Sequence, residues 1–171
     1  MARVTEDRRG ATGGPLGDAL LVAAVALAVR ALYLLEYRTS PFFDFLHLDP
    51  RYYHDWALSI AAGDWMGKEV FEQSPLYPYL LALYFIVFGQ KLFLLRVLQF
   101  GLGAVTAVVI TLLGRRLFGR AAGLAAGIGA ALYAPFIFYE GQVMKEFLTP
   151  LFSALTLLLI YRGLDGARRG S

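Results

Sequence analysis

Four long apolar windows constrain this chain more than any other feature of its sequence. A helix that crosses the hydrocarbon core of a bilayer needs about 20 apolar residues, with roughly 17 to 25 as the usual range. The windows are Leu16–Leu35, Leu92–Leu113, Ala121–Tyr139 and Phe147–Tyr161. Three of them reach that length, and the last does so if it begins within the preceding loop. The sequence therefore predicts an all-α integral membrane protein, folded as a polytopic transmembrane helical bundle.

Composition excludes several other classes of protein. Charged residues make up 17% of the chain, well below the roughly 25% of ordinary globular proteins, which argues against a soluble enzyme. The sixteen Lys and Arg residues sit in short clusters beside the apolar windows and form no stripe for nucleic acid. The absence of cysteine excludes a disulfide scaffold, thiol chemistry and Cys-ligated metal sites.

Charge bias orients the predicted spans. The loop from Pro41 to Ser74 carries six acids and two bases, so the positive-inside rule places it outside. The apolar piece Pro75–Phe88 covers only about 20 Å of a core about 30 Å thick. If it spanned, Arg115, Arg116 and Arg120 would lie on the same side as the acidic loop. We therefore predict four spans, with five as the alternative. The protein is predicted to lie in the cell membrane with both termini in the cytoplasm.

The predicted organisation follows from these windows. It comprises a cytoplasmic tail (1–15), spans at about 16–36, 92–113, 120–139 and 146–162, an outer loop (37–91) and a second tail (164–171). The outer loop is predicted to hold interfacial helices at about 50–62 and 76–88. Asp49 is predicted to cap the first of these helices, with Pro50 at its first position. Aromatic residues on this helix suit the depth of the membrane interface.

Two acidic positions face the outer compartment in this topology. One is Asp49, and the other is the loop that contains Glu140 and Glu146. Carboxylates at the membrane surface among aromatic residues suit general-base or metal-assisted chemistry on a lipid-borne substrate. The structural alternatives are a helix cap for Asp49 and simple loop solvation for the two glutamates.

Charged and small residues within the spans carry further hypotheses. Arg30 and Arg96 place a positive charge within a predicted span, which is energetically costly. Such side chains usually face protein, water or an anionic ligand, and the alternative is that they extend to the membrane interface. The stripe Gly119, Gly123 and Gly127 favours close helix packing. His54 and Asp55 are a poor pair of metal ligands, because adjacent residues on a helix point in different directions. The spacing alone therefore predicts no particular reaction.

The order of several segments carries a resemblance. Three segments follow one another between residues 20 and 162: LDPRYYHDWALSIAAGDW, then FEQSPLYPYLLALYFIVFG, then LLGRRLFGRAAG with the residues after it. In that order they resemble the N-terminal part of the polyprenol-dependent membrane glycosyltransferases with the GT-C fold. The resemblance is greatest to bacterial relatives of the protein mannosyltransferases and of the aminoarabinose transferase.

This resemblance implies an activity and its residues. Such enzymes transfer a sugar from a polyprenyl-phosphate or polyprenyl-pyrophosphate carrier to a glycan, lipid or protein acceptor outside the membrane. Asp49 matches the essential aspartate of the first outer loop, and Glu146 resembles the second acid, with Glu140 as its rival. Arg30 and Arg96 are candidates for the carrier phosphate, by charge alone. The further candidates for substrate binding are Tyr53, His54 and Gln73.

The chain also departs from the family pattern. Pro50 stands where many relatives carry a second acid, so the metal requirement stays open, and Gln73 stands where some have lysine. Family members usually have several hundred residues, so we expect further spans, or another membrane chain, to complete the catalytic unit. Two hypotheses from other classes are a non-catalytic membrane subunit that binds through its glycine face and a small component of a transporter or flippase.

Overall fold

The predicted all-helical fold is confirmed. The computed structural model describes residues 14–66 and 73–170, in which there are seven helices and no strand. They are α1 (Pro15–Tyr37), α2 (Asp49–Ala61), α3 (Leu76–Phe88), α4 (Leu92–Phe118), α5 (Arg120–Leu132), α6 (Ala134–Gly141) and α7 (Leu148–Gly170). Residues 1–13 of the predicted N-terminal tail, and Ser171, lie outside the described residues.

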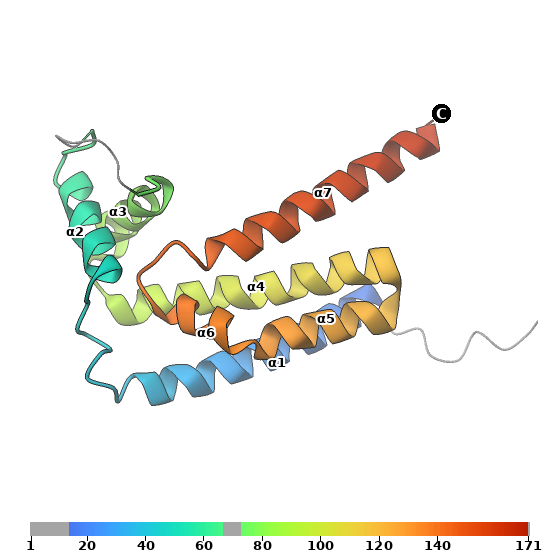
Figure 1. Ribbon diagram of the computed structural model, residues 1–171, viewed down its shortest axis with the longest axis horizontal. Helices are drawn as coiled ribbons and strands as arrows, with labels where there is room; N and C mark the ends of the chain where they lie inside the picture. The colour runs from blue at the N-terminus through green and yellow to red at the C-terminus, as the bar shows by residue number, and fades with distance from the viewer. Residues whose placement is uncertain (1–13, 67–72, 171) are drawn as a thin grey trace, which may run out of the picture.

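Helices α1, α4 and α5 form a bundle with α4 at its centre (Figure 1). Small buried side chains fill the space where the three helices meet. They include Val22 and Ala26 on α1, Ala104 and Ala107 on α4, and Ala131 on α5. Small residues allow helix backbones to approach closely, which is how helices pack in a membrane.

The glycine stripe divides between a turn and a packing face. Gly119 has a φ of +90° and forms the turn between α4 and α5, a conformation that glycine adopts without strain. Gly123 and Gly127 are buried on α5 against α4. A Cβ at Gly123 would lie 2.5 Å from the backbone nitrogen of Arg115. The stripe therefore packs α5 on α4, as predicted.

The segment predicted as one span at 120–139 is broken in two. Helices α5 and α6 meet at an angle of 46°, and Tyr133 between them is extended. Pro135 explains the break, because proline has no N–H for the carbonyl of Ala131 four residues earlier and its ring clashes there. The predicted span at 120–139 therefore consists of two helices joined at a bend, and whether the pair crosses the membrane as one span stays a prediction.

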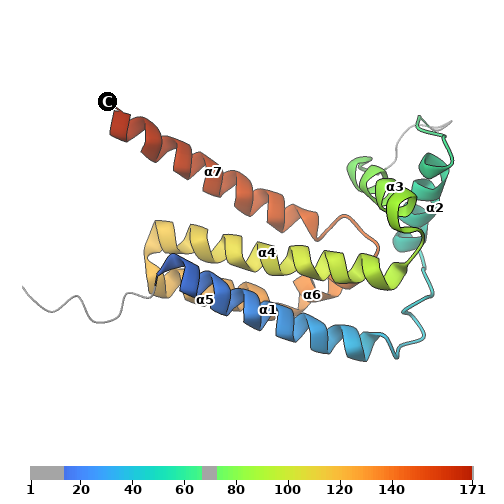
Figure 2. The ribbon, with the colours of Figure 1, turned by 180° about the vertical axis from the view of Figure 1, so that it is seen from behind.

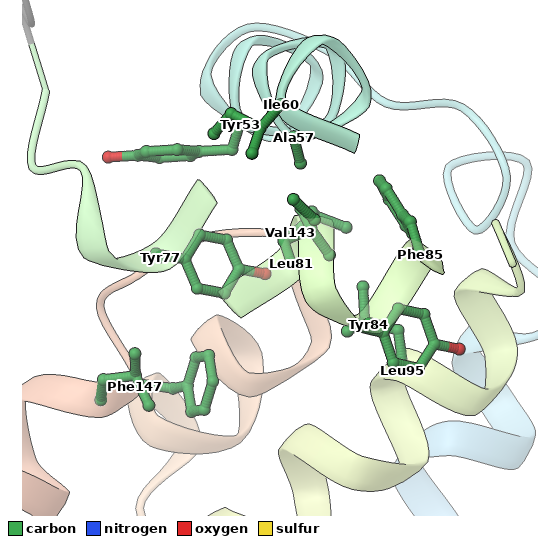
Figure 3. Close-up of a cluster of buried hydrophobic side chains, with 12 residues drawn as sticks. Tyr53, Ala57, Ile60, Tyr77, Leu81, Tyr84, Phe85, Leu95, Val143 and Phe147 are labelled. Carbon is green, nitrogen blue, oxygen red and sulfur yellow. The ribbon is translucent and has the colours of Figure 1, made fainter. Parts of the chain in front are cut away.

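Helices α2 and α3 form a separate layer at one end of the bundle (Figures 1 and 2). They pack on each other, on the start of α4 and on the α6–α7 loop through one buried cluster. Figure 3 shows this cluster, which includes Tyr53, Tyr77, Leu81, Leu95 and Phe147. The cluster attaches the first long loop of the chain to the second.

The opposite end of the bundle is basic. Asp18 on α1 is buried there and accepts hydrogen bonds from Arg115 and from Arg120, the latter at 3.0 Å. The turn that joins α4 to α5 lies at this end, away from α2 and α3 (Figure 2). The fold thus has one end with a cluster of arginines and one end with the aromatic loops.

Two described helices, α1 and α4, are long and apolar enough to cross a membrane. Taken together, α5 and α6 would make a third span. Helix α3 and the apolar part of α7, Leu148–Leu164, are shorter. Helix α7 leans away from α4 and continues to Gly170, beyond the predicted end of its span at 162 (Figure 1).

Candidate active site

The candidate base Asp49 is the first residue of α2 and lies at the surface. The predicted cap is wrong, because Leu48 occupies the N-cap position and no side-chain capping hydrogen bond forms. A capping side chain must come from a residue just outside the helix, and Asp49 is already inside it. Leu48 has a φ of 53°, which residues with a Cβ rarely adopt. Such backbone strain tends to occur at functional sites.

A hydrogen-bonded network joins α2 and the residues just before α3 to the α6–α7 loop. The hydroxyl of Tyr53 on α2 donates to Gln73 Oε1 at 3.2 Å, and Lys145 Nζ donates to the same oxygen at 2.8 Å. Lys145 Nζ also lies 5.9 Å from the centre of the Tyr53 ring. The structure therefore brings together two of the candidate binding residues, Tyr53 and Gln73, beside the loop that carries Glu146.

His54 lies apart from this network. Its Nδ1 is 3.1 Å from Asp55 Oδ1, and its ring packs edge-on against Phe85 with centroids 5.2 Å apart. Asp55 in turn lies 3.5 Å from Arg51, on the exposed side of α2. In the described residues no group of three His, Asp or Glu side chains could hold a metal ion.

Arg30 and Glu140 form a buried ion pair between α1 and α6. Arg30 Nε donates to Glu140 Oε2 at 2.6 Å and Nη2 donates to Oε1 at 2.7 Å, with the two side chains 1% and 3% exposed. Arg30 Nη1 donates to the carbonyls of Ala131 and Ala26. Arg30 thus binds protein and does not extend to the interface. Every nitrogen of its guanidinium donates to the protein, so a carrier phosphate would have to displace Glu140.

Glu140, near the end of α6, and Glu146, in the α6–α7 loop, line one groove. Its volume is about 430 Å³, and its walls are mostly apolar, with Tyr133, Phe136, Tyr139 and Phe147 beside Glu140 and Glu146. Both oxygens of Glu140 are bound by Arg30. Glu146 is partly buried, and its Oε2 has no hydrogen-bond partner in the described part of the chain. Glu146 is therefore the acid of this pair that can meet a ligand.

Arg96 lies beneath the turn that follows α1. Its Nε donates to the carbonyl of Gly141 at 2.9 Å, and its guanidinium carbon lies 4.1 Å from the centre of the Phe43 ring. The side chain is 1% exposed, yet Nη1 has no hydrogen-bond partner among the described residues. In contrast to Arg30, Arg96 retains a donor for a ligand.

One family profile matches residues 72–170, which is more than half of the chain. It is the profile of the dolichyl-phosphate-mannose-protein mannosyltransferases. The chain belongs to this family. Neither a curated protein nor a solved structure matches the chain. The matched residues include α3 to α7, and therefore Arg96, Glu140 and Glu146, whereas α1 and α2 with Asp49 precede the match.

Membership of the dolichyl-phosphate-mannose-protein mannosyltransferase family implies glycosyl transfer at the level of the family. The apolar helices agree with this, since a lipid-linked donor has to be met at a membrane. Lys145 contributes to the candidate site but was missed from the sequence. No local pattern in the sequence pairs Lys145 with Gln73, which lies 72 residues away.

Proposed function

We propose that this protein provides the outer-loop part of the site at which a sugar passes from a polyprenyl-phosphate-linked donor to an acceptor. Asp49 is the general base, and Glu146 is the second acid of the site. The observation that carries the proposal is the network of Tyr53, Gln73 and Lys145, which ties α2 to the α6–α7 loop. Through it, the helix of Asp49 and the loop of Glu146 belong to one end of the molecule, beside an apolar groove.

The reaction is a substitution at the anomeric carbon. Asp49 takes the proton of the acceptor O–H or N–H group as the acceptor atom bonds to that carbon. The bond between the anomeric carbon and the phosphate oxygen breaks, and polyprenyl phosphate leaves with the bonding electrons. Configuration at the carbon is inverted. A positioned base typically contributes about 10²- to 10⁴-fold to such a step.

The proposed site faces outward. Basic residues concentrate on the cytoplasmic side of membrane proteins, and the end with Arg115 and Arg120 is opposite the layer of α2 and α3. Exposed Leu80, Leu83 and Ile86 on α3 suit contact with lipid at the membrane surface. In this proposal α1, α4, the α5–α6 pair and α7 cross the membrane, while α3 lies along it.

The test is Asp49→Asn in the protein produced from its complete reading frame. Membranes receive polyprenyl-phosphate mannose with a labelled sugar, and label is counted in the endogenous glycan, lipid and protein fractions. We expect transfer to fall by about 10²- to 10⁴-fold, with the amount of folded protein unchanged because no cap is lost. The matched control is Asp55→Asn, an exposed carboxylate on the same helix, which should transfer normally.

Two results would refute the proposal. Transfer by Asp49→Asn within about threefold of the parent would remove the general base from the mechanism. If the parent protein transfers no label, the proposal that it transfers mannose is refuted.

A further inference from the structure

The guanidinium of Arg96 is buried among aromatic rings. The side chain is 1% exposed, and no carboxylate of the described residues forms an ion pair with it. A buried charge is costly unless other groups compensate it. Two rings do so here, because the guanidinium carbon lies 4.1 Å from the centre of the Phe43 ring and 5.2 Å from that of Tyr37. Such cation–π contacts are strongest where water is excluded.

Both rings come from the chain that leads from α1 to α2. Tyr37 is the last residue of α1, and Phe43 belongs to the 38–48 segment, which crosses the end of the bundle (Figure 1). The Tyr37 hydroxyl donates to the carbonyl of Phe42 at 3.3 Å. Phe43 is 6% exposed, whereas Phe42 and Phe45 are 64% and 60% exposed. Phe43 is thus the phenylalanine that attaches this segment to the bundle.

The end of α6 holds Arg96 from another direction. Arg96 Nε donates to the carbonyl of Gly141 at 2.9 Å, and Gln99, one turn later on α4, donates to the carbonyl of Gln142 at 2.9 Å. The Gln142 amide donates in turn to the Tyr37 hydroxyl at 3.3 Å. Arginine suits this double contact, because its planar guanidinium donates in its plane and stacks through its face.

The position of Phe43 bears on Asp49. Helix α2 enters the buried cluster through Tyr53, which is one turn after Asp49, while Asp49 itself lies at the surface. The chain before Asp49 therefore has to hold the start of α2 in place. Its attachments are Leu46, which packs against the same cluster, and Phe43 on Arg96. The six residues from Phe43 to Asp49 reach at most about 20 Å.

We propose that Arg96 is a positioning residue. Through Phe43 it attaches the 38–48 segment to the end of α6, and so it fixes the start of α2, with Asp49, relative to the loop of Glu146. The consequence for transfer rests on the proposed function, whereas the attachment does not. This role uses Nε and the face of the guanidinium and does not involve Nη1.

The test is hydrogen–deuterium exchange of the purified chain in lipid nanodiscs, followed by mass spectrometry. The amides of Thr39, Ser40 and Phe43 each donate to a carbonyl at 3.0 Å, so their exchange reports how often the segment detaches. Phe43→Leu keeps an apolar side chain and removes the ring. A desolvated cation–π contact corresponds to about a 30-fold preference, so exchange in residues 39–48 should accelerate by up to about 30-fold. Arg96→Met should accelerate it too, and Phe43→Leu should add little to Arg96→Met, because both remove one contact.

The controls separate this contact from general packing. Phe45→Leu removes an exposed ring from the same segment and should exchange as the parent does. Phe43→Tyr keeps the ring and should exchange more slowly than Phe43→Leu. Exchange in the middle of α1 and of α4 should stay the same in every variant. The attachment is overturned if Phe43→Leu exchanges like Phe45→Leu, or if α1 and α4 accelerate equally.

A transfer assay tests the consequence for catalysis. A small misplacement of a catalytic group can cost about 100-fold in rate. Phe43→Leu should therefore lower kcat for transfer from polyprenyl-phosphate mannose by up to about 100-fold, with little change in KM for that donor. A kcat equal to that of the parent, despite faster exchange, would overturn the positioning role. If the parent transfers no mannose, the proposed function fails, and the exchange experiment still decides whether Arg96 attaches the segment.

Discussion

Gly103 is the position at which a single methyl group tests the ion pair between Arg30 and Glu140. Gly103 lies on α4, where α6 crosses it, and the Glu140 carboxyl group occupies the space above its Cα. A Cβ at this position would overlap all three carboxyl atoms of Glu140. The carboxyl group cannot retreat freely, because Arg30 holds both of its oxygens at 2.6 and 2.7 Å. Gly103→Ala should therefore break the ion pair without touching either charge.

The expected loss is large compared with that of an ordinary substitution. Breaking a buried ion pair so that one charge is left without its partner costs about 3–5 kcal/mol. Alanine in a helix gains about 1 kcal/mol over glycine, which offsets part of this cost and leaves a net loss of about 2–4 kcal/mol. Gly101→Ala gains the same helix propensity on the same helix, but no atom of the described residues outside its own turn of helix lies within 4 Å of its Cβ position. It should be as stable as the parent or more stable.

The measurement is unfolding of the purified chain in mixed micelles, titrated with sodium dodecyl sulfate and followed by circular dichroism. Gly103→Ala should unfold at a clearly lower fraction of dodecyl sulfate than the parent, and Gly101→Ala should not. Equal stability of the two variants would refute the reasoning, because the carboxyl group would then have room to move while keeping Arg30.

Two further predictions concern topology and helix packing. Single cysteines can replace Met66 and Phe118, which are both highly exposed, because the chain has no cysteine of its own. A reagent added outside intact cells should label only the cysteine at position 66. Labelling at position 118 would favour a spanning α3. Gly123→Ala should lower stability in the same micelle titration, because its Cβ would lie 2.5 Å from the backbone nitrogen of Arg115. Gly129→Ala should not lower it, because no other described part of the chain lies within 4 Å of its Cβ position. Equal effects of the two substitutions would contradict the packing of α5 on α4.

The helices could be predicted from the sequence because apolar periodicity and turn residues act locally. The bounds of the helix predicted at 76–88 coincide with those of α3, and those predicted for the first span lie within one residue of α1 at each end. The break before α6 also has a local signal, because Pro135 lies inside an apolar run. The predicted cap at Asp49 failed because capping depends on a helix boundary to within one residue.

The pairing within the candidate site depends on tertiary structure. Arg30 and Glu140 are 110 residues apart, and Lys145 and Gln73 are 72 residues apart. No local pattern selects one partner among the acids and amides of the chain. Charge alone therefore predicted the same ligand for Arg30 and for Arg96, whereas packing distinguishes them. Arg30 has its partners within the bundle, and Arg96 Nη1 has no hydrogen-bond partner among the residues that the structure describes.

Arg30, Pro135 and Glu140 together explain how a broken helix can hold a loop in a defined place. Pro135 removes the N–H that the carbonyl of Ala131 would otherwise accept from, and Arg30 Nη1 supplies a donor to that carbonyl at 3.1 Å. The same guanidinium binds Glu140 on the far side of the break. One side chain on α1 thus provides a hydrogen bond to the carbonyl at the end of α5 and also binds α6. An unpaired backbone carbonyl would be costly within a bilayer. Because α6 leads directly to Lys145 and Glu146, the direction in which the second loop leaves the bundle depends on Arg30, although Arg30 touches neither of them.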